Sequence, residues 1–258
     1  MLKTRVVKIG GNDLDRPEWL ATCARALKPL EPLVVVHGGG QAVSALSRRL
    51  DLPVERRGGV RVTTAAVAEV VELVLAGPAN RLVVAALREA GLDAIGLSGV
   101  DGGLLTARPA GGAGGAGGLG HVGEIAAVRA SLLESLLLAG LTPVIAPVAP
   151  GPEGGLPFNV NADAAAAAVA AALGAAELLF ISDVPGVQLD GVVQPSLAAG
   201  EIETLIELGA ATDGMAVKLR AAAAALRDGV RAVRIGDVRL LGHPSAGTCI
   251  VAAAVQPA

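Results

Sequence analysis

Short apolar runs alternate with longer helical stretches along most of this chain. Strand-length apolar runs occupy residues 5–9, 33–37, 94–97, 142–146, 178–182 and 232–235. Stretches with helical length and pattern separate them, at residues 17–27, 41–50, 66–89, 131–139, 164–173, 201–208 and 217–227. Such alternation is typical of βαβ units, whose strands form a parallel sheet. The order of the elements therefore predicts an α/β fold.

The chain contains two α/β halves, joined by a proline-rich segment at residues 147–157. Its 258 residues fit one domain or two lobes. We expect a single domain over residues 1–258, with an N-terminal lobe of about 1–150 and a C-terminal lobe of about 155–258 that share one sheet. Because 52% of the residues are hydrophobic and only 1% are aromatic, Ala, Val and Leu must form a tightly packed core.

Charge argues against a nucleic-acid-binding protein, and the cysteine content argues against a cysteine metal site. The net charge of −3 and the isoelectric point near 5.7 do not favour nucleic-acid binding. The arginine pairs at residues 48–49 and 56–57 are interpreted as solvated faces. Cys23 and Cys249 are far apart in the sequence and have no metal-ligand spacing, which fits a reducing compartment.

The mean hydropathy of +0.59 requires a test for membrane segments. A spanning helix needs about 20 consecutive apolar residues. The run at residues 135–152 contains four prolines, and the run that opens at residue 164 meets Gly174 and Glu177. The N-terminus lacks the apolar stretch of a signal peptide. We therefore expect a cytoplasmic protein with no membrane contact.

Familiar nucleotide and hydrolase motifs are absent from the sequence or out of context. No Gly-Lys dipeptide occurs, so there is no Walker A loop, and the motifs H-E-x-x-H and G-x-S-x-G are missing. Gly112, Gly114 and Gly117 match G-x-G-x-x-G, but they lie in the low-complexity segment 110–120, with no strand before it and no helix after it. We interpret this segment as a loop.

Glycine-rich stretches follow the first two expected strands, at the edge where open α/β sheets bind ligands. In K-I-G-G, Lys8 precedes Gly10 and Gly11, in a chain with only four lysines. Glycines let backbone N–H groups approach an anion while an ammonium group binds phosphate, although a tight turn with an outward lysine is the simpler reading. In V-H-G-G-G, three glycines open a helix and form an anion site, whereas His37 is interpreted as a buried core histidine.

Two further stretches could bind a carboxylate or an amide. Arg61, in G-G-V-R-V-T-T, alternates with valines as in a short strand or hairpin. Its planar guanidinium suits a substrate carboxylate, although a single arginine is more often a surface charge. In F-N-V-N-A-D, either Asn161 or Asp163 should cap the next helix. With Asn159, they would lie on one side of the chain if the stretch is extended, which suggests a polar site.

The C-terminal half of the chain contains two further turns with polar residues. S-D-V-P-G-V closes a buried strand, and T-D-G-M-A-V-K opens a helix that carries Lys218. Each could be ordinary turn chemistry. Together with Lys8, they provide two ammonium groups and an aspartate, which is what in-line phosphoryl transfer without a P-loop requires.

The ordered motifs resemble the acetylglutamate kinases, a branch of the amino acid kinase family, over essentially the whole chain. They are K-I-G-G, V-H-G-G-G, G-V-R-V-T, G-L-S-G-x-D-G, G-H-V-G-E, P-V-I-A-P, N-V-N-A-D, S-D-V-P-G-V and T-D-G-M-x-V-K. The resemblance implies a three-layer αβα sandwich around a mainly parallel central sheet. It also implies transfer of the γ-phosphoryl group of ATP to the side-chain carboxylate of N-acetyl-L-glutamate in arginine biosynthesis. Mg²⁺ would be held mainly by the ATP phosphates.

The resemblance assigns roles to residues at matching positions. The catalytic residues are Lys8 and Lys218, which stabilise the charge of the phosphoryl group in flight, and Asp163, which holds both lysines. The acceptor and the phosphoryl group are assigned to Gly10, Gly11, Gly38, Gly39, Arg61, Asn159 and Asn161. ATP binding is assigned to Asp183, Val184, Pro185, Gly186, Val187, Ala210, Ala211, Thr212 and Gly214.

The chain departs from the family pattern at three places, one of which is the glycine-rich insert at residues 110–118, in a hairpin region that we expect to be variable. Thr64 stands where many relatives carry an acidic residue. Only seven residues precede Lys8, so we expect no N-terminal helix of the kind that links dimers into arginine-inhibited hexamers, and hence a homodimer insensitive to arginine.

Two alternative functions stay open. One is a kinase of the same fold that acts on glutamate or aminoadipate attached to a carrier protein, which would require a basic surface for the acidic carrier. The other is a non-catalytic nucleotide-binding sensor, which would not require Lys8, Asp163 and Lys218 together.

Overall fold

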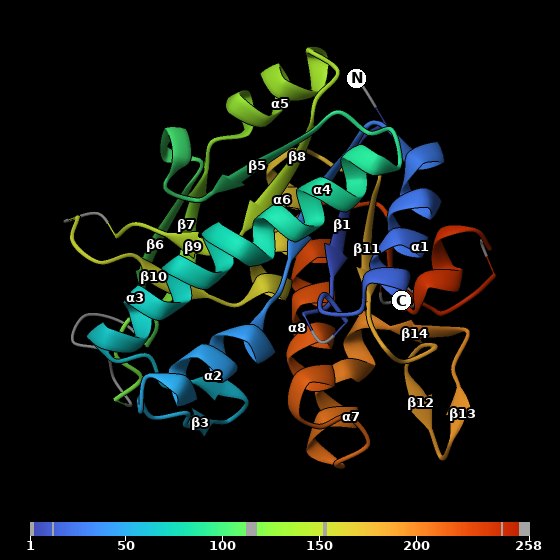
Figure 1. Cartoon of the computed structure of the whole chain (residues 1–258). Coiled ribbons are helices and arrows are strands. Elements are labelled where there is room, and N and C mark those ends of the chain that lie inside the picture. The colour runs from blue at the N-terminus through green and yellow to red at the C-terminus, as the bar shows by residue number, and fades with distance from the viewer. Residues whose placement is uncertain (1–2, 12, 112–117, 152–153, 244, 253–258) are drawn as a thin grey trace.

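An eight-stranded sheet lies at the centre of the molecule (Figure 1). The structure is a computed structural model, and it describes residues 3–11, 13–111, 118–151, 154–243 and 245–252. The strand order of the sheet is β14-β16-β15-β11-β1-β2-β8-β5, and only the pair β15–β16 is antiparallel. The strands are β1 (Arg5–Ile9), β2 (Leu33–His37), β5 (Ala94–Ser98), β8 (Thr142–Ala146), β11 (Glu177–Ile181), β14 (Ser196–Ala198), β15 (Val233–Gly236) and β16 (Thr248–Val251). The two halves of the chain meet at β1, which pairs with β2 on one side and with β11 on the other.

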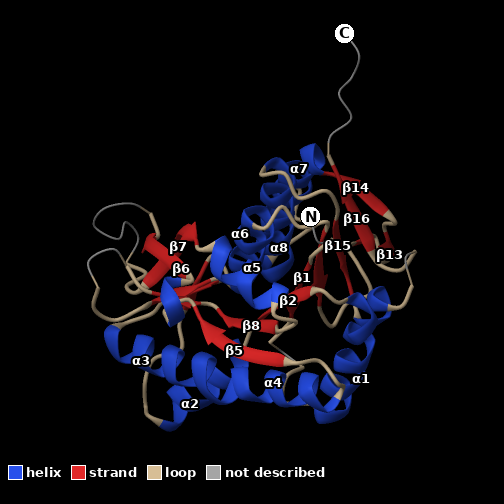
Figure 2. Ribbon diagram, turned by 90° about the horizontal axis from the view of Figure 1, so that it is seen from above, coloured by secondary structure: helices blue, strands red, loops and turns tan. Residues whose placement is uncertain are grey.

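Helices cover both faces of this sheet, as expected for a three-layer αβα sandwich. Figure 2 shows α1 (Pro17–Leu27) and α4 (Asn80–Glu89) on one face, and α5 (Ala130–Leu138), α6 (Ala162–Ala172) and α8 (Asp213–Arg227) on the other. The remaining α-helices are α2 (Gly40–Arg49), α3 (Ala65–Val74) and α7 (Ile202–Glu207). Short 3-10 turns occur at Lys28–Leu30, Asp101–Gly103, Ala199–Glu201 and Val238–Leu241.

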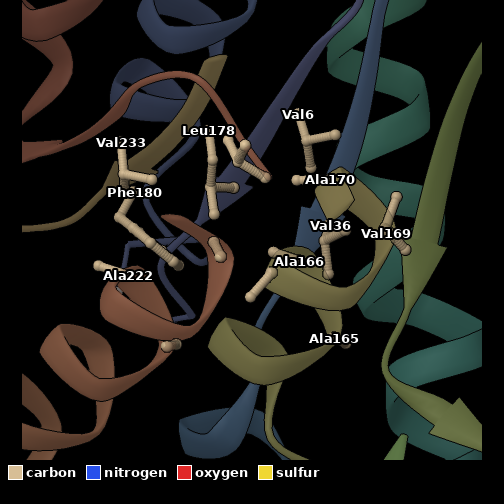
Figure 3. Packing of buried hydrophobic residues seen from close by; sticks show 14 of the residues in the cluster. Val6, Val36, Ala165, Ala166, Val169, Ala170, Leu178, Phe180, Ala222 and Val233 are labelled. Atoms are coloured by element: carbon tan, nitrogen blue, oxygen red, sulfur yellow. The ribbon is translucent and has the colours of Figure 1, made fainter. Parts of the chain in front are cut away.

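Alternate residues of the central strands pack into two different hydrophobic cores, one on each face of the sheet. Val6 and Val36 belong to the cluster formed with α6 and α8, whereas Val7 and Val35 pack with α1 and α4. This is the period-two geometry of a strand that is buried on both faces. In Figure 3, small alanines such as Ala166 and Ala222 lie near the buried ring of Phe180. The aromatic-poor composition is thus accommodated by small residues on the helices.

A second sheet and one hairpin were not predicted as such. The second sheet has the order β6-β7-β10-β9 and comprises β6 (Leu105–Pro109), β7 (Val122–Val128), β10 (Phe158–Val160) and β9 (Val148–Ala149). A hairpin joins β12 (Gln188–Leu189) to β13 (Val192–Val193). The short strand or hairpin expected around Arg61 is confirmed as β3 (Arg56–Arg57) and β4 (Val60–Arg61). The glycine-rich match at Gly112, Gly114 and Gly117 lies outside the described residues.

The single long helix expected at residues 66–89 is wrong in one respect. The structure has α3, then a five-residue π-helical turn at Leu75–Ala79, then α4. Gly77 has non-helical dihedral angles and Pro78 has no N–H to donate, which explains the break. By length and composition alone, Ala65–Glu89 is the one described stretch that could cross a membrane. Here, however, α4 packs on α1 and the central sheet, as a layer helix does.

Candidate active site

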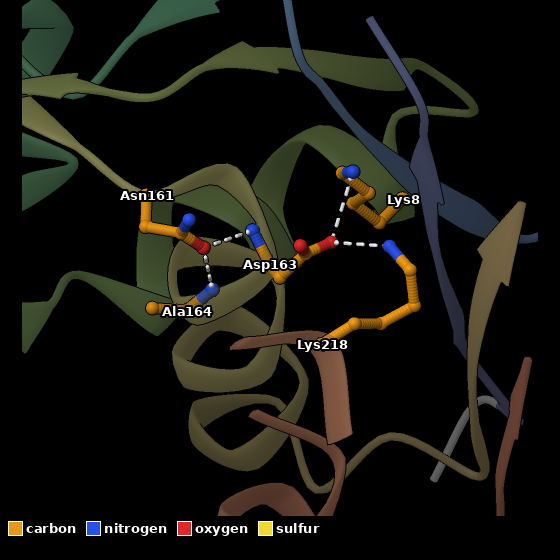
Figure 4. Close-up of polar contacts among 5 residues, drawn as sticks. All are labelled: Lys8, Asn161, Asp163, Ala164 and Lys218. Carbon is orange, nitrogen blue, oxygen red and sulfur yellow. Dashed lines mark hydrogen bonds and ion pairs between the residues drawn. The ribbon is translucent and has the colours of Figure 1, made fainter. Parts of the chain in front are cut away.

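Three charged side chains meet beyond the end of the central strand β1. Lys8 comes from β1, Asp163 from the first turn of α6, and Lys218 from α8. Figure 4 shows both ammonium groups directed at the same carboxylate oxygen. Lys8 Nζ lies 2.9 Å from Asp163 Oδ1, and Lys218 Nζ lies 3.2 Å from it. The two halves of the chain are thus joined by one carboxylate.

This cluster is buried and carries a net charge of +1. The side chains of Lys8, Lys218 and Asp163 are only 9%, 8% and 10% exposed. Burial opposes ionisation of Asp163, but the two ammonium groups and their hydrogen bonds outweigh it, so the pKa of Asp163 lies below its ordinary value. Burial and the charge of Lys8 lower the pKa of Lys218 to about 8, in spite of Asp163. The surplus positive charge favours an anion at this position.

Asn161 positions Asp163 as the cap of α6. Its Oδ1 accepts hydrogen bonds from the N–H groups of Asp163 at 2.9 Å and Ala164 at 3.0 Å. The prediction that Asn161 or Asp163 caps this helix is confirmed. The stretch is extended only as far as Val160, where β10 ends, and the helix starts at Ala162, so the condition for placing Asn159, Asn161 and Asp163 on one side is not met. A role of Asn161 in substrate binding stays a prediction.

The two glycine turns after β1 and β2 press against each other. A Cβ atom on Gly11 would lie 2.3 Å from the nitrogen of Gly39, so no side chain fits there. The N–H of Gly10 donates to Ile181 O at 2.9 Å, and the N–H of Gly38 donates to Ile9 O at 3.0 Å. The expectation that Gly38 offers its N–H to an anion is therefore wrong here, because the sheet already uses that donor. Among the described residues, the N–H groups of Gly11 and Gly39 have no such backbone acceptor.

Arg61 and Asn159 lie in one hydrogen-bonded chain at the edge of the site. The Asn159 amide donates to Thr63 Oγ1 at 3.1 Å, and Thr63 Oγ1 donates to Arg61 O at 3.0 Å. Arg61 Nη2 donates to Gly40 O at 2.8 Å and to Ser44 Oγ at 2.6 Å. Sequence reasoning missed Thr63 and Ser44, because no motif marks a hydroxyl group that only supports another side chain.

The guanidinium of Arg61 has unused capacity for an anion. Its Nη1 is buried and has no hydrogen-bond partner among the described residues. Burial and the charges of Arg56 and Arg48 lower the pKa of Arg61. A buried, unpaired guanidinium nitrogen is costly, and a carboxylate would satisfy it. A hollow of about 670 Å³ opens beside the glycine turns, and Gly11, Gly39, Arg48 and Arg56 are among its lining residues.

The segments assigned to ATP lie in the C-terminal half of the chain. The stretch from Asp183 to Val187 follows β11, and the Val187 N–H donates to Thr248 Oγ1 at 2.9 Å. The N–H groups of Ala210 and Ala211 donate to Leu205 O, at 2.9 and 3.3 Å. Thr248 was missed, because its contact lies 61 residues from Val187.

The start of α8 completes these segments. Thr212 O accepts from the N–H groups of Met215 and Ala216, so Thr212 begins the helix that carries Lys218. A Cβ atom on Gly214 would meet nothing within 4 Å. The nucleotide roles of Val184, Pro185, Gly186 and the residues around them stay predictions.

Comparisons with known proteins agree with the motifs and the fold. A model of the amino acid kinase family matches residues 3–237. Acetylglutamate kinase from Chloroflexus aurantiacus is 47% identical over 252 residues, covering 96% of both chains. Acetylglutamate kinase from Geobacillus kaustophilus is 44% identical over 237 residues, covering 91% of this chain and 90% of the relative. The crystal structure of smu.665 from Streptococcus mutans UA159 has a TM-score of 0.86 at 29% identity, covering 97% of this chain and 99% of that chain.

We expect the substitution Asp163→Asn to destabilise the fold at pH 7, because two buried ammonium groups lose their counter-charge. Breaking a buried ion pair from one side costs about 3–5 kcal/mol. The folded-state pKa of Asp163 lies below its unfolded value, so the contribution of the carboxylate is present at pH 7 and disappears as the pH falls through the folded pKa. Urea unfolding at pH 7 should therefore separate the variant from the wild type, and the gap should narrow in acid.

The matched control for this prediction is Asp93→Asn. Asp93 pairs with Arg88, and both side chains are more than half exposed, at 62% and 58%. The unfolding midpoint should not change, because an exposed pair contributes little. Equal effects of the two substitutions would contradict the proposed importance of the buried cluster.

Proposed function

The chain belongs to the amino acid kinase family, and on that basis we propose that it transfers the γ-phosphoryl group of ATP to the side-chain carboxylate of N-acetyl-L-glutamate. The product is the acyl phosphate N-acetyl-L-glutamyl 5-phosphate, an intermediate of arginine biosynthesis. The observation that carries this proposal is the buried cluster of Lys8, Asp163 and Lys218, with its surplus positive charge. Beside it are the N–H groups of Gly11 and Gly39, which have no backbone acceptor among the described residues. Such a site binds a transferring phosphoryl group without a P-loop.

The chemistry requires alignment and neutralisation of charge, and it requires no general base. The acceptor carboxylate is already ionised at neutral pH, and its oxygen attacks the γ-phosphorus of ATP. The bond from that phosphorus to the β–γ bridging oxygen breaks, and ADP leaves with the electron pair. Lys8 and Lys218 neutralise charge on the phosphoryl oxygens, while Asp163 keeps both ammonium groups in place.

The residues of the cluster fit Mg²⁺ only as a companion of ATP. Among the described residues, no three His, Cys, Asp or Glu side chains come together to hold a metal ion. Asp163 is already bound by two lysines. Mg²⁺ would then be held by phosphate oxygens and water, and it would neutralise charge on those phosphates.

Arg61 and Asn159 are proposed to bind the part of the acceptor that does not react. The unpaired Nη1 of Arg61 would bind the α-carboxylate of N-acetyl-L-glutamate. Asn159, which Thr63 holds, would bind the acetamido group. The names of the close relatives favour this acceptor over a carrier-linked one. The paired lysines argue against a sensor that only binds nucleotide.

Trapping with hydroxylamine tests this function directly. Purified protein with Mg-ATP and N-acetyl-L-glutamate should yield a hydroxamate, because hydroxylamine captures acyl phosphates. Glutamate and aspartate serve as parallel acceptors and should give little product. Lys8→Ala should lose activity by orders of magnitude and remain folded by circular dichroism. No hydroxamate from any acceptor, in folded protein, would refute the proposal.

The pKa of Lys218 predicts an alkaline limit to activity. The ammonium form is the active one, so kcat/KM should fall above about pH 8, where Lys218 loses its proton. Lys218→Arg keeps its charge throughout this range and should move the decline to higher pH, although its absolute rate will be lower. A wild-type profile that is flat to pH 9.5, or an identical decline in both proteins, would contradict this assignment.

We further propose a homodimer formed through the outer side of α3. Leu73 is 62% exposed there. Light scattering should show a dimer that the substitution Leu73→Glu converts to a monomer. Leu208→Glu changes a leucine that is 76% exposed on the C-terminal side of α7, and the variant should stay dimeric. A monomeric wild type would contradict the proposal. Location in the cytoplasm stays a prediction.

A further inference from the structure

We propose that His37, held by Asn80, is a positioning residue that aims the N–H of Gly39 at the phosphoryl group. His37 is the last residue of β2 and directly precedes Gly38 and Gly39. The sequence predicted a buried core histidine at this position, and the side chain is indeed fully buried. Its hydrogen bonds, however, are directed at the glycine turn. The inference rests on the proposed function for the identity of the anion.

Asn80 fixes the tautomer of the His37 ring. The Asn80 amide nitrogen lies 2.9 Å from Val144 O, and only a donor can face a carbonyl oxygen. The same nitrogen lies 3.2 Å from His37 Nε2. It also lies 3.5 Å from Leu97 O. Because an amide nitrogen donates and does not accept, Nε2 must be the acceptor in its contact with Asn80. The proton of the neutral ring then sits on Nδ1.

His37 Nδ1 therefore donates to the carbonyl oxygen of Gly38, at 2.7 Å. The C=O and N–H of a trans peptide point in opposite directions. With the Gly38 carbonyl held on the ring, the Gly39 N–H points away from His37. The nitrogen of Gly39 faces Gly11, whose Cβ position would lie 2.3 Å from it. One hydrogen bond thus sets the direction of the Gly39 N–H, which has no backbone acceptor in the described part of the chain.

The hydrogen bonds of His37 require a neutral ring, and the surroundings of the ring oppose its protonation. Protonation would put a second donor on Nε2, facing the donor of Asn80. Burial and the positive charge of Lys8 outweigh the hydrogen bond to Gly38, and the pKa of His37 falls to about 4. Asn80 Oδ1 has no hydrogen-bond partner among the described residues. The amide is therefore oriented by the contacts of its nitrogen with Val144 O and His37 Nε2.

Nitrogen-15 NMR of histidine-labelled wild-type protein tests the tautomer independently of activity. The chain has only three histidines, His37, His121 and His243, so the three rings can be assigned by single substitutions. The His37 ring should show a protonated Nδ1 and a bare Nε2, unchanged from pH 8 to pH 5.5. A protonated Nε2, or titration within that range, would overturn the inference even if the enzyme is fully active.

Two substitutions of His37 separate its two hydrogen bonds. His37→Asn keeps a donor near the position of Nδ1, and His37→Gln keeps a polar group near the position of Nε2. If His37 aims Gly39, His37→Gln should lower kcat about 10- to 100-fold with KM nearly unchanged, because the lost interaction forms in the transition state. His37→Asn should retain kcat within about fivefold of the wild type. Equal losses in both variants, or a loss confined to KM, would overturn the inference.

Wild-type protein that yields no hydroxamate, but shows the expected tautomer, would count against the proposed function and not against the geometry.

Discussion

The carboxylate of Asp163 is the interaction on which the site depends. Two ammonium groups could not be buried side by side without it, because an unpaired buried charge is strongly unfavourable. The shared oxygen connects β1, α6 and α8, and therefore the two halves of the chain. The cap provided by Asn161 holds the start of α6, and small residues let α6 and α8 approach each other closely. Charge, capping and core packing thus support one geometry.

The sequence predicted what depends on local pattern. Hydrophobic periodicity located six of the eight described strands of the central sheet to within a residue or two, but not β14 and β16. The topology of parallel sheets put the polar turns at the carboxyl ends of the strands. The motifs marked Lys8 and Lys218, the resemblance to the acetylglutamate kinases implied that Asp163 holds both lysines, and the structure brings the three side chains together. The break at Gly77 and Pro78 was also readable from residue type, but apolar periodicity across it suggested one helix.

What the sequence could not predict depends on contacts between distant segments. Whether the Gly38 N–H is free is decided by its hydrogen bond to Ile9 across the sheet. Thr63 supports Asn159, which is 96 residues away, and Asn80 reaches Val144 over 64 residues. The second sheet likewise depends on a pairing between strands that are not neighbours in the sequence, because β10 lies beside β7. No propensity or motif encodes such pairings.

The central place of β1 has a consequence for how the chain folds. This strand is synthesised first, and its neighbour β2 follows it closely in the sequence. Its other neighbour, β11, starts at Glu177, which is 172 residues after Arg5. Until then, one edge of β1 is open, and Lys8 has neither Asp163 nor a buried environment. Pairings over such long sequence distances slow folding and expose strand edges. A nascent N-terminal half is therefore a poor folding unit, and the central sheet is completed only when the last third of the chain arrives.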